Sequence, residues 1–276
     1  MELWVTEEQT PDMRLSLKSS GTLRMEDTNF QHLAVVETNQ YGRMLLLDGL
    51  VMTTEADEFV YHEMITQIAL NSHPNPERVL IIGGGDGGAL REVVKHPAVK
   101  EGYLVEIDDR VIQASRDFFP TLNESFDNPK AQVMVEDGLK FIKEHVDYFD
   151  VILIDSSEPM GPGEELFEAP FYRNVYRALK VDGMMVAQTE SPFVNQEVIR
   201  KSFKGIASVF PITKLYMASI PTYPSGLWTF TAGSKEYDPE IPIRTDMAVH
   251  HKYYNASVHE GCFKLPSFVA RLTEQE

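Results

Sequence analysis

A glycine-rich segment is the first part of the chain whose residue types and spacing predict chemistry. An apolar run beginning at Val79 leads into Gly-Gly-Gly-Asp-Gly-Gly, in which Gly83, Gly85 and Gly88 satisfy the pattern G-x-G-x-x-G. Glycines between a buried strand and a helix let the backbone approach a ligand closely. The pattern is weak by itself, but a strand before it and a helix from about Ala89 favour nucleoside binding, with Gly83 and Gly85 in contact with the ligand.

Carboxylates in and after this segment indicate which nucleoside it binds. Glu106 follows the next predicted strand, about 20 residues on, where a carboxylate accepts hydrogen bonds from ribose hydroxyls. Asp86 would repel the pyrophosphate of a dinucleotide and attract the cationic tail of an adenosyl sulfonium. It would also repel the tail carboxylate of intact S-adenosylmethionine. Asp86 therefore indicates a decarboxylated donor, and a helix N-cap is its alternative role.

A third predicted strand ends at Glu136-Asp137-Gly138. Because carboxyl ends of parallel strands meet at one edge of a sheet, Asp137 would lie beside the glycine loop. Its carboxylate could accept a hydrogen bond from the amino group of an adenine. Capping of a helix over 139–145 is the alternative.

The next buried run ends in an acid, Asp155, before a loop that contains Glu158 and Gly161-Pro-Gly163. Displacement at a sulfonium carbon needs a neutral amine, yet an alkyl amine is about 99.9% protonated at neutral pH. We expect Asp155 to bind the ammonium and to accept its proton as general base. Tyr61 and Tyr223 could assist with aromatic faces and hydroxyls, and core or interface packing is their alternative role.

The elements that must position these residues follow two patterns. Residues 1 to about 55 alternate apolar and polar positions, which predicts a small antiparallel β domain, and helical spacing follows over 58–71. Beyond Arg78, short apolar runs alternate with helical stretches, which predicts a parallel sheet. We expect its strands near 79–82, 102–107, 132–135, 151–154 and 184–187, with two more at 212–216 and 227–232 that form an antiparallel edge.

The predicted fold is therefore α/β, preceded by the antiparallel β domain. We expect a Rossmann-like, methyltransferase-type arrangement, in which a mostly parallel seven-stranded sheet has helices on both faces. The domains would comprise residues 1–57 and 58–276. Tyr176 and Lys180 match the Tyr-x-x-x-Lys pair of short-chain dehydrogenases, but the serine and glycine spacing of those enzymes is missing, so we interpret both residues as helix surface.

Composition limits the classes of partner. The chain has 25 Lys and Arg against 42 Asp and Glu, a formal charge of −17, which disfavours nucleic acid and anionic membranes and suits a cationic substrate, although acidic surfaces also serve solubility. The single cysteine, Cys262, excludes an intramolecular disulfide, and no apolar run approaches the roughly 20 residues of a membrane span. The N-terminus lacks the pattern of a secretory signal, so we expect a soluble, cytoplasmic protein.

Several longer strings resemble the spermidine synthase family of aminopropyltransferases. They are Leu47-Asp-Gly49, Asp57-Glu-Phe59, Tyr61-His-Glu-Met64, His73-Pro-Asn-Pro76, Val79 to Gly88, Asp155-Ser-Ser157 and Pro221 to Gly226. The resemblance covers nearly the whole chain. It implies transfer of an aminopropyl group from decarboxylated S-adenosylmethionine, a co-substrate, to putrescine, which gives spermidine and 5′-methylthioadenosine. It also implies no metal or permanently bound cofactor, and a homodimer or homotetramer joined partly through the N-terminal strands.

The resemblance also assigns site residues. It implies donor contacts at Gln31, His62, Asp86, Glu106, Asp137 and Gly138. Asp155 matches the proton acceptor, and Tyr61, Gln188 and Tyr223 match residues that line the diamine channel. Glu158 stands where animal and plant members commonly carry aspartate, so the site for the distal ammonium differs by one methylene.

Other functions stay open from sequence alone. Agmatine, cadaverine or spermidine could replace putrescine, because these acceptors differ only at the remote end of the channel. A small-molecule methyltransferase that uses intact S-adenosylmethionine is compatible with the sheet, although Asp86 disfavours it. A polyamine-binding module without catalysis would leave Asp155 and the donor pocket without a joint purpose.

Overall fold

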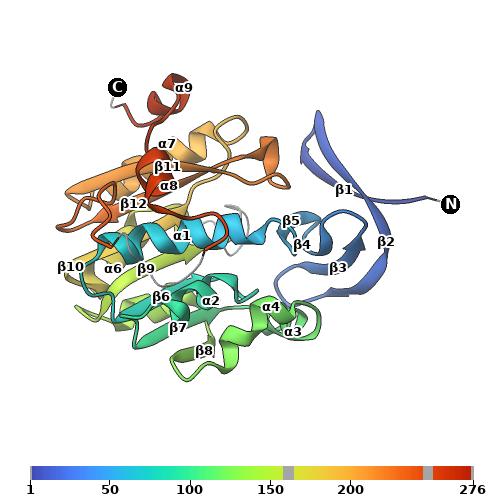
Figure 1. Ribbon diagram of the computed structural model, residues 1–276, viewed down its shortest axis with the longest axis horizontal. Coiled ribbons are helices and arrows are strands. Elements are labelled where there is room, and N and C mark those ends of the chain that lie inside the picture. Colours follow the sequence, from blue (N-terminus) through green and yellow to red (C-terminus); the bar gives the residue numbers. More distant parts are fainter. Residues whose placement is uncertain (1, 158–164, 245–250, 275–276) are drawn as a thin grey trace.

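The computed structural model describes residues 2–157, 165–244 and 251–274, which form two sheets with helices around the second (Figure 1). The first is a five-stranded antiparallel sheet in chain order, built by the apolar and polar alternation that the sequence predicted. Its strands are β1 (Leu3–Thr10), β2 (Met13–Asp27), β3 (His32–Thr38), β4 (Gly42–Leu47) and β5 (Leu50–Thr54). In Figure 1 the long hairpin of β1 and β2 forms the side of this sheet farthest from the helices.

The second sheet has seven strands in the order β11-β12-β10-β9-β6-β7-β8. Five of them run parallel, and β12 pairs antiparallel with both β10 and β11. The strands are β6 (Arg78–Gly83), β7 (Glu101–Glu106), β8 (Ala131–Val135), β9 (Phe149–Asp155), β10 (Leu179–Gln188), β11 (Ile212–Ser219) and β12 (Leu227–Ser234). The predicted fold class, including the antiparallel edge, is confirmed.

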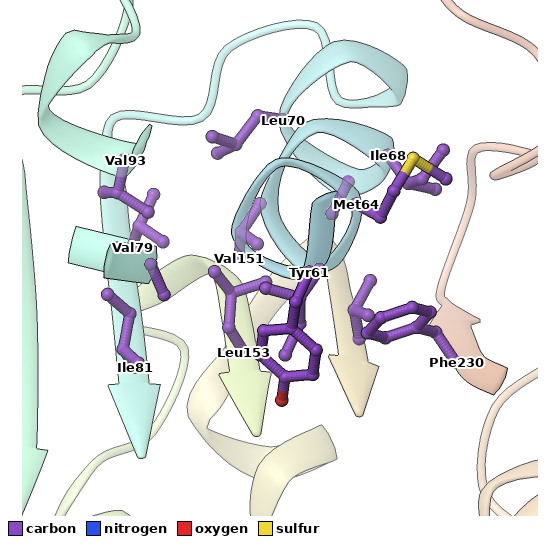
Figure 2. Packing of buried hydrophobic residues seen from close by; sticks show 14 of the residues in the cluster. Tyr61, Met64, Ile68, Leu70, Val79, Ile81, Val93, Val151, Leu153 and Phe230 are labelled. Carbon is purple, nitrogen blue, oxygen red and sulfur yellow. The ribbon is translucent and has the colours of Figure 1, made fainter. Parts of the chain in front are cut away.

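Alternating residues of the central strands supply the cores on both faces of this sheet. Val79 and Leu153 pack under α1 (Glu58–Ser72) and α2 (Gly88–Lys95), as Figure 2 shows. Leu80 and Ile152 face the opposite side. That side is covered by α5 (Gly138–Phe141), α6 (Ala169–Ala178) and α7 (Gln196–Ala207). The other α-helices in the described part of the chain are α3 (Asp109–Phe118), α4 (Pro120–Asn123), α8 (Ala256–Gly261) and α9 (Ser267–Ala270).

An apolar cluster joins the N-terminal sheet to helix α3. Leu33 and Leu45, from β3 and β4, pack against Val111 and Ala114 of α3, and all four side chains are buried. Burial of this kind stabilises by about 1.5–3 kcal/mol for each large aliphatic side chain. The contact holds the ends of the N-terminal strands beside the parallel sheet.

One sequence interpretation is wrong. Tyr176 lies on α6, with its ring 5.2 Å from that of Phe210, but Lys180 lies on β10 rather than on a helix. Helix α6 ends before Leu179, and the Lys180 ammonium contacts the buried Asp150 carboxylate at 2.7 Å.

Within the described residues, no helix is long and apolar enough to cross a membrane.

Candidate active site

A cavity of about 250 Å³ lies at the carboxyl ends of β6, β7 and β9. Parallel sheets commonly bind ligands at this edge. Eleven sequence-predicted residues line it: Gln31, Tyr61, His62, Gly83, Gly85, Asp86, Glu106, Asp137, Gly138, Asp155 and Tyr223. Side chains of β4 and β5, among them Leu45, Leu47 and Met52, form part of the wall. The cavity is therefore built by both sheets.

The glycines of the loop after β6 allow close approach of neighbouring strands. Gly83 has φ +83°, and a Cβ there would lie 2.2 Å from the Asp155 carbonyl oxygen. The Gly84 amide donates to that same oxygen at 2.9 Å. A Cβ on Gly85 would lie 2.8 Å from the Glu106 side chain. The loop thus passes directly over the ends of β9 and β7, which only glycine permits.

Glu106 lies at the end of β7 and is held by backbone amides. Its carboxylate accepts from the amides of Gly85, at 3.1 Å, and Asp108, at 2.9 Å. Burial, with a smaller effect of the Asp108 charge, raises the pKa of Glu106 to about 7 despite these hydrogen bonds. The Gln31 amide donates to Asp108 at 3.0 Å, which ties the N-terminal domain to this edge of the cavity.

Asp137 is the N-cap of α5 and also lines the cavity. Its carboxylate accepts from the Leu139 amide at 2.8 Å. A Cβ on Gly138 would lie 2.5 Å from Ile82 Cγ2, so glycine lets the turn pack against β6. From this one position Asp137 can both cap α5 and face the cavity, so the capping role and the predicted adenine contact are compatible.

Asp86 and His62 form an ion pair at the cavity wall. One Asp86 oxygen accepts from the Gly88 amide at 2.8 Å, so the capping alternative holds in part, although the N-cap residue of α2 is Gly87. The other oxygen lies 3.2 Å from His62 Nε2. His62 Nδ1 lies 2.6 Å from Glu58. Burial opposes the charged ring, but the Asp86 and Glu58 carboxylates raise the pKa of His62 well above its ordinary value.

Asp155 receives a hydrogen bond from a residue 94 positions earlier in the chain. The Tyr61 hydroxyl donates to Asp155 Oδ1 at 2.6 Å, and Oδ2 is buried without a hydrogen-bond partner among the described residues. In Figure 2 the Tyr61 hydroxyl points toward the carboxyl ends of the strands. Burial and the charge of Asp86 raise the pKa of Asp155 to about 6, while His62 and Tyr61 act in the opposite direction.

A smaller hollow of about 20 Å³ adjoins the cavity, with which it shares Tyr61 and Tyr223. Gln188 lines this hollow rather than the main cavity, and its amide donates to the Ser156 carbonyl at 3.1 Å. Val51, Met52, Pro224 and Trp228 are also among its lining residues. The walls are mainly apolar and aromatic, with polar groups at the end of β9.

The loop that carries Tyr223 is fixed by hydrogen bonds at both sides. The Tyr223 hydroxyl donates to the Met52 carbonyl at 2.6 Å. Asp57 accepts from the amide and the hydroxyl of Thr222, at 3.1 and 2.8 Å.

Glu158, predicted to contact the substrate, lies outside the described residues. Asp57 and Glu58 were not assigned to the site, although both belong to the Asp57-Glu-Phe59 string of the family resemblance and Glu58 precedes His62 by four residues.

These features define a class before any relative is considered. A Rossmann-like sheet places a glycine loop, the buried Glu106 carboxylate and the buried, protonatable Asp155 around one cavity. That combination is typical of an enzyme that binds a nucleoside and transfers a proton, here at the carboxyl end of β9.

Comparison with known proteins identifies the family. Residues 58–244 match the spermine/spermidine synthase domain, and residues 3–55 match the spermidine synthase tetramerisation domain. The polyamine aminopropyltransferase of Caldicellulosiruptor saccharolyticus is 51% identical over 99% of both chains, and that of Bacillus subtilis is 50% identical over 98% of this chain and 99% of the relative.

Solved structures agree with this result. A spermidine synthase in complex with the transition state analogue AdoDATO superposes with a TM-score of 0.96 at 40% identity, and spermidine synthase from Thermotoga maritima with 0.93 at 39%. Each alignment covers 98% of this chain and 94% of the other. The chain belongs to the spermidine synthase family of aminopropyltransferases. The predicted reaction class, aminopropyl transfer, is confirmed.

Proposed function

We propose that the chain transfers the aminopropyl group of decarboxylated S-adenosylmethionine to putrescine. The putrescine nitrogen attacks the aminopropyl carbon bound to sulfur, and the carbon–sulfur bond breaks with its electron pair on sulfur. One proton leaves the nitrogen. The products are spermidine and 5′-methylthioadenosine, which balances atoms and charge when an enzyme group takes the proton.

The donor fits the charges of the main cavity. Asp86 offers a carboxylate to the ammonium of the donor's tail, and Glu106 offers one to the ribose hydroxyls. Asp137 and Gln31 line the cavity, and in this proposal they contact the adenosine, for which Gly83, Gly85 and Gly138 leave room. A tail carboxylate would face Asp86 unfavourably, which favours the decarboxylated donor over the intact one.

The Asp155–Tyr61 hydrogen bond is the observation that carries the mechanism. A carboxylate with a pKa of about 6 is a stronger base than an ordinary aspartate and is still mainly ionised near neutral pH. Asp155 can therefore bind the attacking ammonium and accept its proton as the nitrogen approaches carbon. Tyr61 fixes one oxygen of this carboxylate and leaves Oδ2 for the amine.

The smaller hollow suits a short, unbranched diamine. Its aromatic and apolar walls, including Tyr223 and Trp228, match methylene groups, and the Gln188 side chain and the Ser156 carbonyl lie near its polar end. In this proposal the acceptor is putrescine, whose four methylene groups lie along these walls. In this proposal Glu158 binds the distal ammonium.

The N-terminal residues, 1–57, would serve both assembly and the acceptor side. Val51 and Met52 line the acceptor hollow, whereas Trp4 on β1 and Met25 on β2 are 55% and 61% exposed. Exposed apolar side chains on a long hairpin favour a contact with another copy of the chain. We propose a homodimer or homotetramer joined through this hairpin, with residues 58–276 as the catalytic domain.

Replacement of Asp155 tests the base. Asp155→Asn keeps the shape and the Tyr61 contact but accepts no proton, so turnover should fall by about 10²–10⁴-fold. Binding of 5′-methylthioadenosine, measured by calorimetry, should stay within about threefold of the wild type because Asp155 faces the amine rather than the adenosine. Unchanged turnover would exclude Asp155 as the base.

A further inference from the structure

A row of four charged side chains with alternating sign connects α2 to the donor end of the cavity. We call Arg91, Glu58, His62 and Asp86 the charged row. Two guanidinium nitrogens of Arg91 each lie 2.9 Å from a Glu58 oxygen. Glu58 lies 2.6 Å from His62 Nδ1, and His62 Nε2 lies 3.2 Å from Asp86. Only Asp86 and His62 line the cavity, so Glu58 and Arg91 act from behind it.

The four side chains of this row are largely buried. The Glu58 and His62 side chains are each 3% exposed, and those of Arg91 and Asp86 are each 12% exposed. Removal of one partner from a buried ion pair leaves an uncompensated charge, which is strongly unfavourable. Each member of the row therefore restrains its neighbours.

The two carboxylates determine the protonation of His62. A ring nitrogen without a proton would direct its lone pair at a carboxylate, so two carboxylate contacts require a proton on each nitrogen. Burial works against an ionised Glu58, yet His62 and Arg91 lower its pKa to about 2. With Glu58 ionised, the imidazolium is the stable form, and its Nε2–H points at Asp86. The Asp155 carboxylate is a further charged group close enough to interact with this ring.

The sequence also fixes the position of the ring from the other side. A Cβ on Gly88 would lie 2.1 Å from His62 Cε1, which is far inside van der Waals contact. The last glycine of the G-x-G-x-x-G pattern thus provides space for the His62 ring to reach Asp86. Glu58 is one helical turn before His62 on α1, where side chains four residues apart meet.

We propose that Glu58, anchored by Arg91, is a positioning residue that orients the His62 ring and through it directs the Asp86 carboxylate at the ammonium of the donor's tail. The inference rests on the proposed function, because it assigns Asp86 to a donor with an aminopropyl ammonium. Glu58 touches neither substrate. Its effect should therefore be confined to the part of the donor that Asp86 binds.

Glu58→Gln tests this role. Glutamine keeps the length of the side chain but removes the charge. The positive charge of His62 is then no longer balanced by Glu58 beside a cationic ligand, and the ring loses the charged contact that orients it toward Asp86. Both effects weaken binding of the donor. We expect the KM for decarboxylated S-adenosylmethionine to rise on the order of tenfold, with kcat changed less, in the range of coupling between contacting charged groups. The Kd of 5′-methylthioadenosine, which lacks the ammonium, should stay within about twofold.

A direct readout is the NMR titration of the His62 ring. In Glu58→Gln we expect the His62 ring to lose its proton at a lower pH than in the wild type, because one of the two carboxylates that raise its pKa is gone. The matched control is Glu63→Gln, on the same helix and also buried, whose carboxylate accepts from the Lys252 and Tyr253 amides. The control should alter thermal stability but neither the donor KM nor the His62 titration.

Two results would overturn the proposal. One is a Glu58→Gln enzyme with wild-type donor KM and wild-type His62 titration, and the other is equal weakening of donor and 5′-methylthioadenosine. If Glu58→Gln does not fold, Glu58→Asp keeps the charge but retracts it by one methylene, and an unchanged donor KM in that variant would equally contradict the role. Spermidine formation by the wild type tests the proposed function separately, since it does not depend on either variant.

Discussion

Replacing Tyr61 by phenylalanine removes the hydroxyl that donates to Asp155 over 2.6 Å. The pKa of Asp155 is about 6 with this hydrogen bond in place, because burial and the Asp86 charge raise it while His62 and Tyr61 lower it. A hydrogen bond to a charged group contributes about 1.5 kcal/mol or more, which corresponds to about one pKa unit. We therefore expect the pKa of Asp155 to be about one unit higher in Tyr61→Phe.

This shift predicts a loss of activity that depends on pH. The ionised carboxylate accepts the proton, so activity falls as the pH falls through the pKa of Asp155. A shift of about one unit lowers the ionised fraction about twofold at pH 7 and about fivefold at pH 6. The acid limb of the pH–activity profile should therefore move to higher pH by about one unit.

The assay is the release of 5′-methylthioadenosine, measured as kcat/KM across pH 5 to 9. Tyr216→Phe is the matched control, because it removes a buried hydroxyl that donates to the Met64 carbonyl at 2.9 Å and does not contact Asp155. Its acid limb should coincide with that of the wild type. A Tyr61→Phe enzyme that loses the same factor at every pH, with the acid limb unmoved, would refute the reasoning.

Three further predictions concern other parts of the site. Asp86→Asn should raise the KM for the decarboxylated donor on the order of tenfold but change the Kd of 5′-methylthioadenosine by less than about threefold. Equal weakening of both ligands in calorimetry would count against a contact between Asp86 and the donor's tail. Gly88→Ala places a Cβ 2.1 Å from the His62 ring, so the free energy of unfolding should fall by about 1–3 kcal/mol in urea denaturation, and an unchanged midpoint would contradict this packing. Asp57→Asn weakens the two hydrogen bonds from Thr222, so initial-rate kinetics should show a larger rise in the acceptor KM than in the donor KM. A larger rise in the donor KM would exclude Asp57 as an anchor of the acceptor side.

The parallel sheet could be predicted from the sequence because its strands are buried on both faces. A run such as Val151 to Ile154 is continuous and apolar, and β9 extends this run by only a few residues, to Phe149–Asp155. Residues that follow such strands, including Glu106 and Asp155, must then meet at one edge. This rule places the acids of the cavity without any knowledge of the helices.

Contacts between distant segments could not be predicted in this way. The wall residues Leu45 and Met52 belong to strands whose alternation indicates a buried face but not what covers it. Lys180 was assigned to a helix together with Tyr176, four residues earlier, but α6 ends at Ala178 and the chain continues directly into β10, while the nearest glycine, Gly183, comes only after both residues. Glu58 has helical spacing to His62, but its pairing with Arg91 depends on how α1 packs against α2.

The residues that line the acceptor channel could also not be predicted from the sequence pattern. Gln188 was assigned to the channel only by family resemblance. The hollow that it lines also includes Tyr223 and Trp228, which lie more than 30 residues later in the chain. Their rings lie 4.7 Å apart across the loop between β11 and β12. Packing of this kind is a tertiary property that periodicity does not encode.

Product analysis tests the central proposal most directly. The wild-type enzyme is incubated with decarboxylated S-adenosylmethionine and, separately, with putrescine, cadaverine, agmatine or spermidine, and the products are identified by mass spectrometry. Our account predicts spermidine and 5′-methylthioadenosine in equal amounts, with the highest kcat/KM for putrescine and no transfer from intact S-adenosylmethionine. A higher kcat/KM for another acceptor, or methyl transfer from the intact donor, would contradict it.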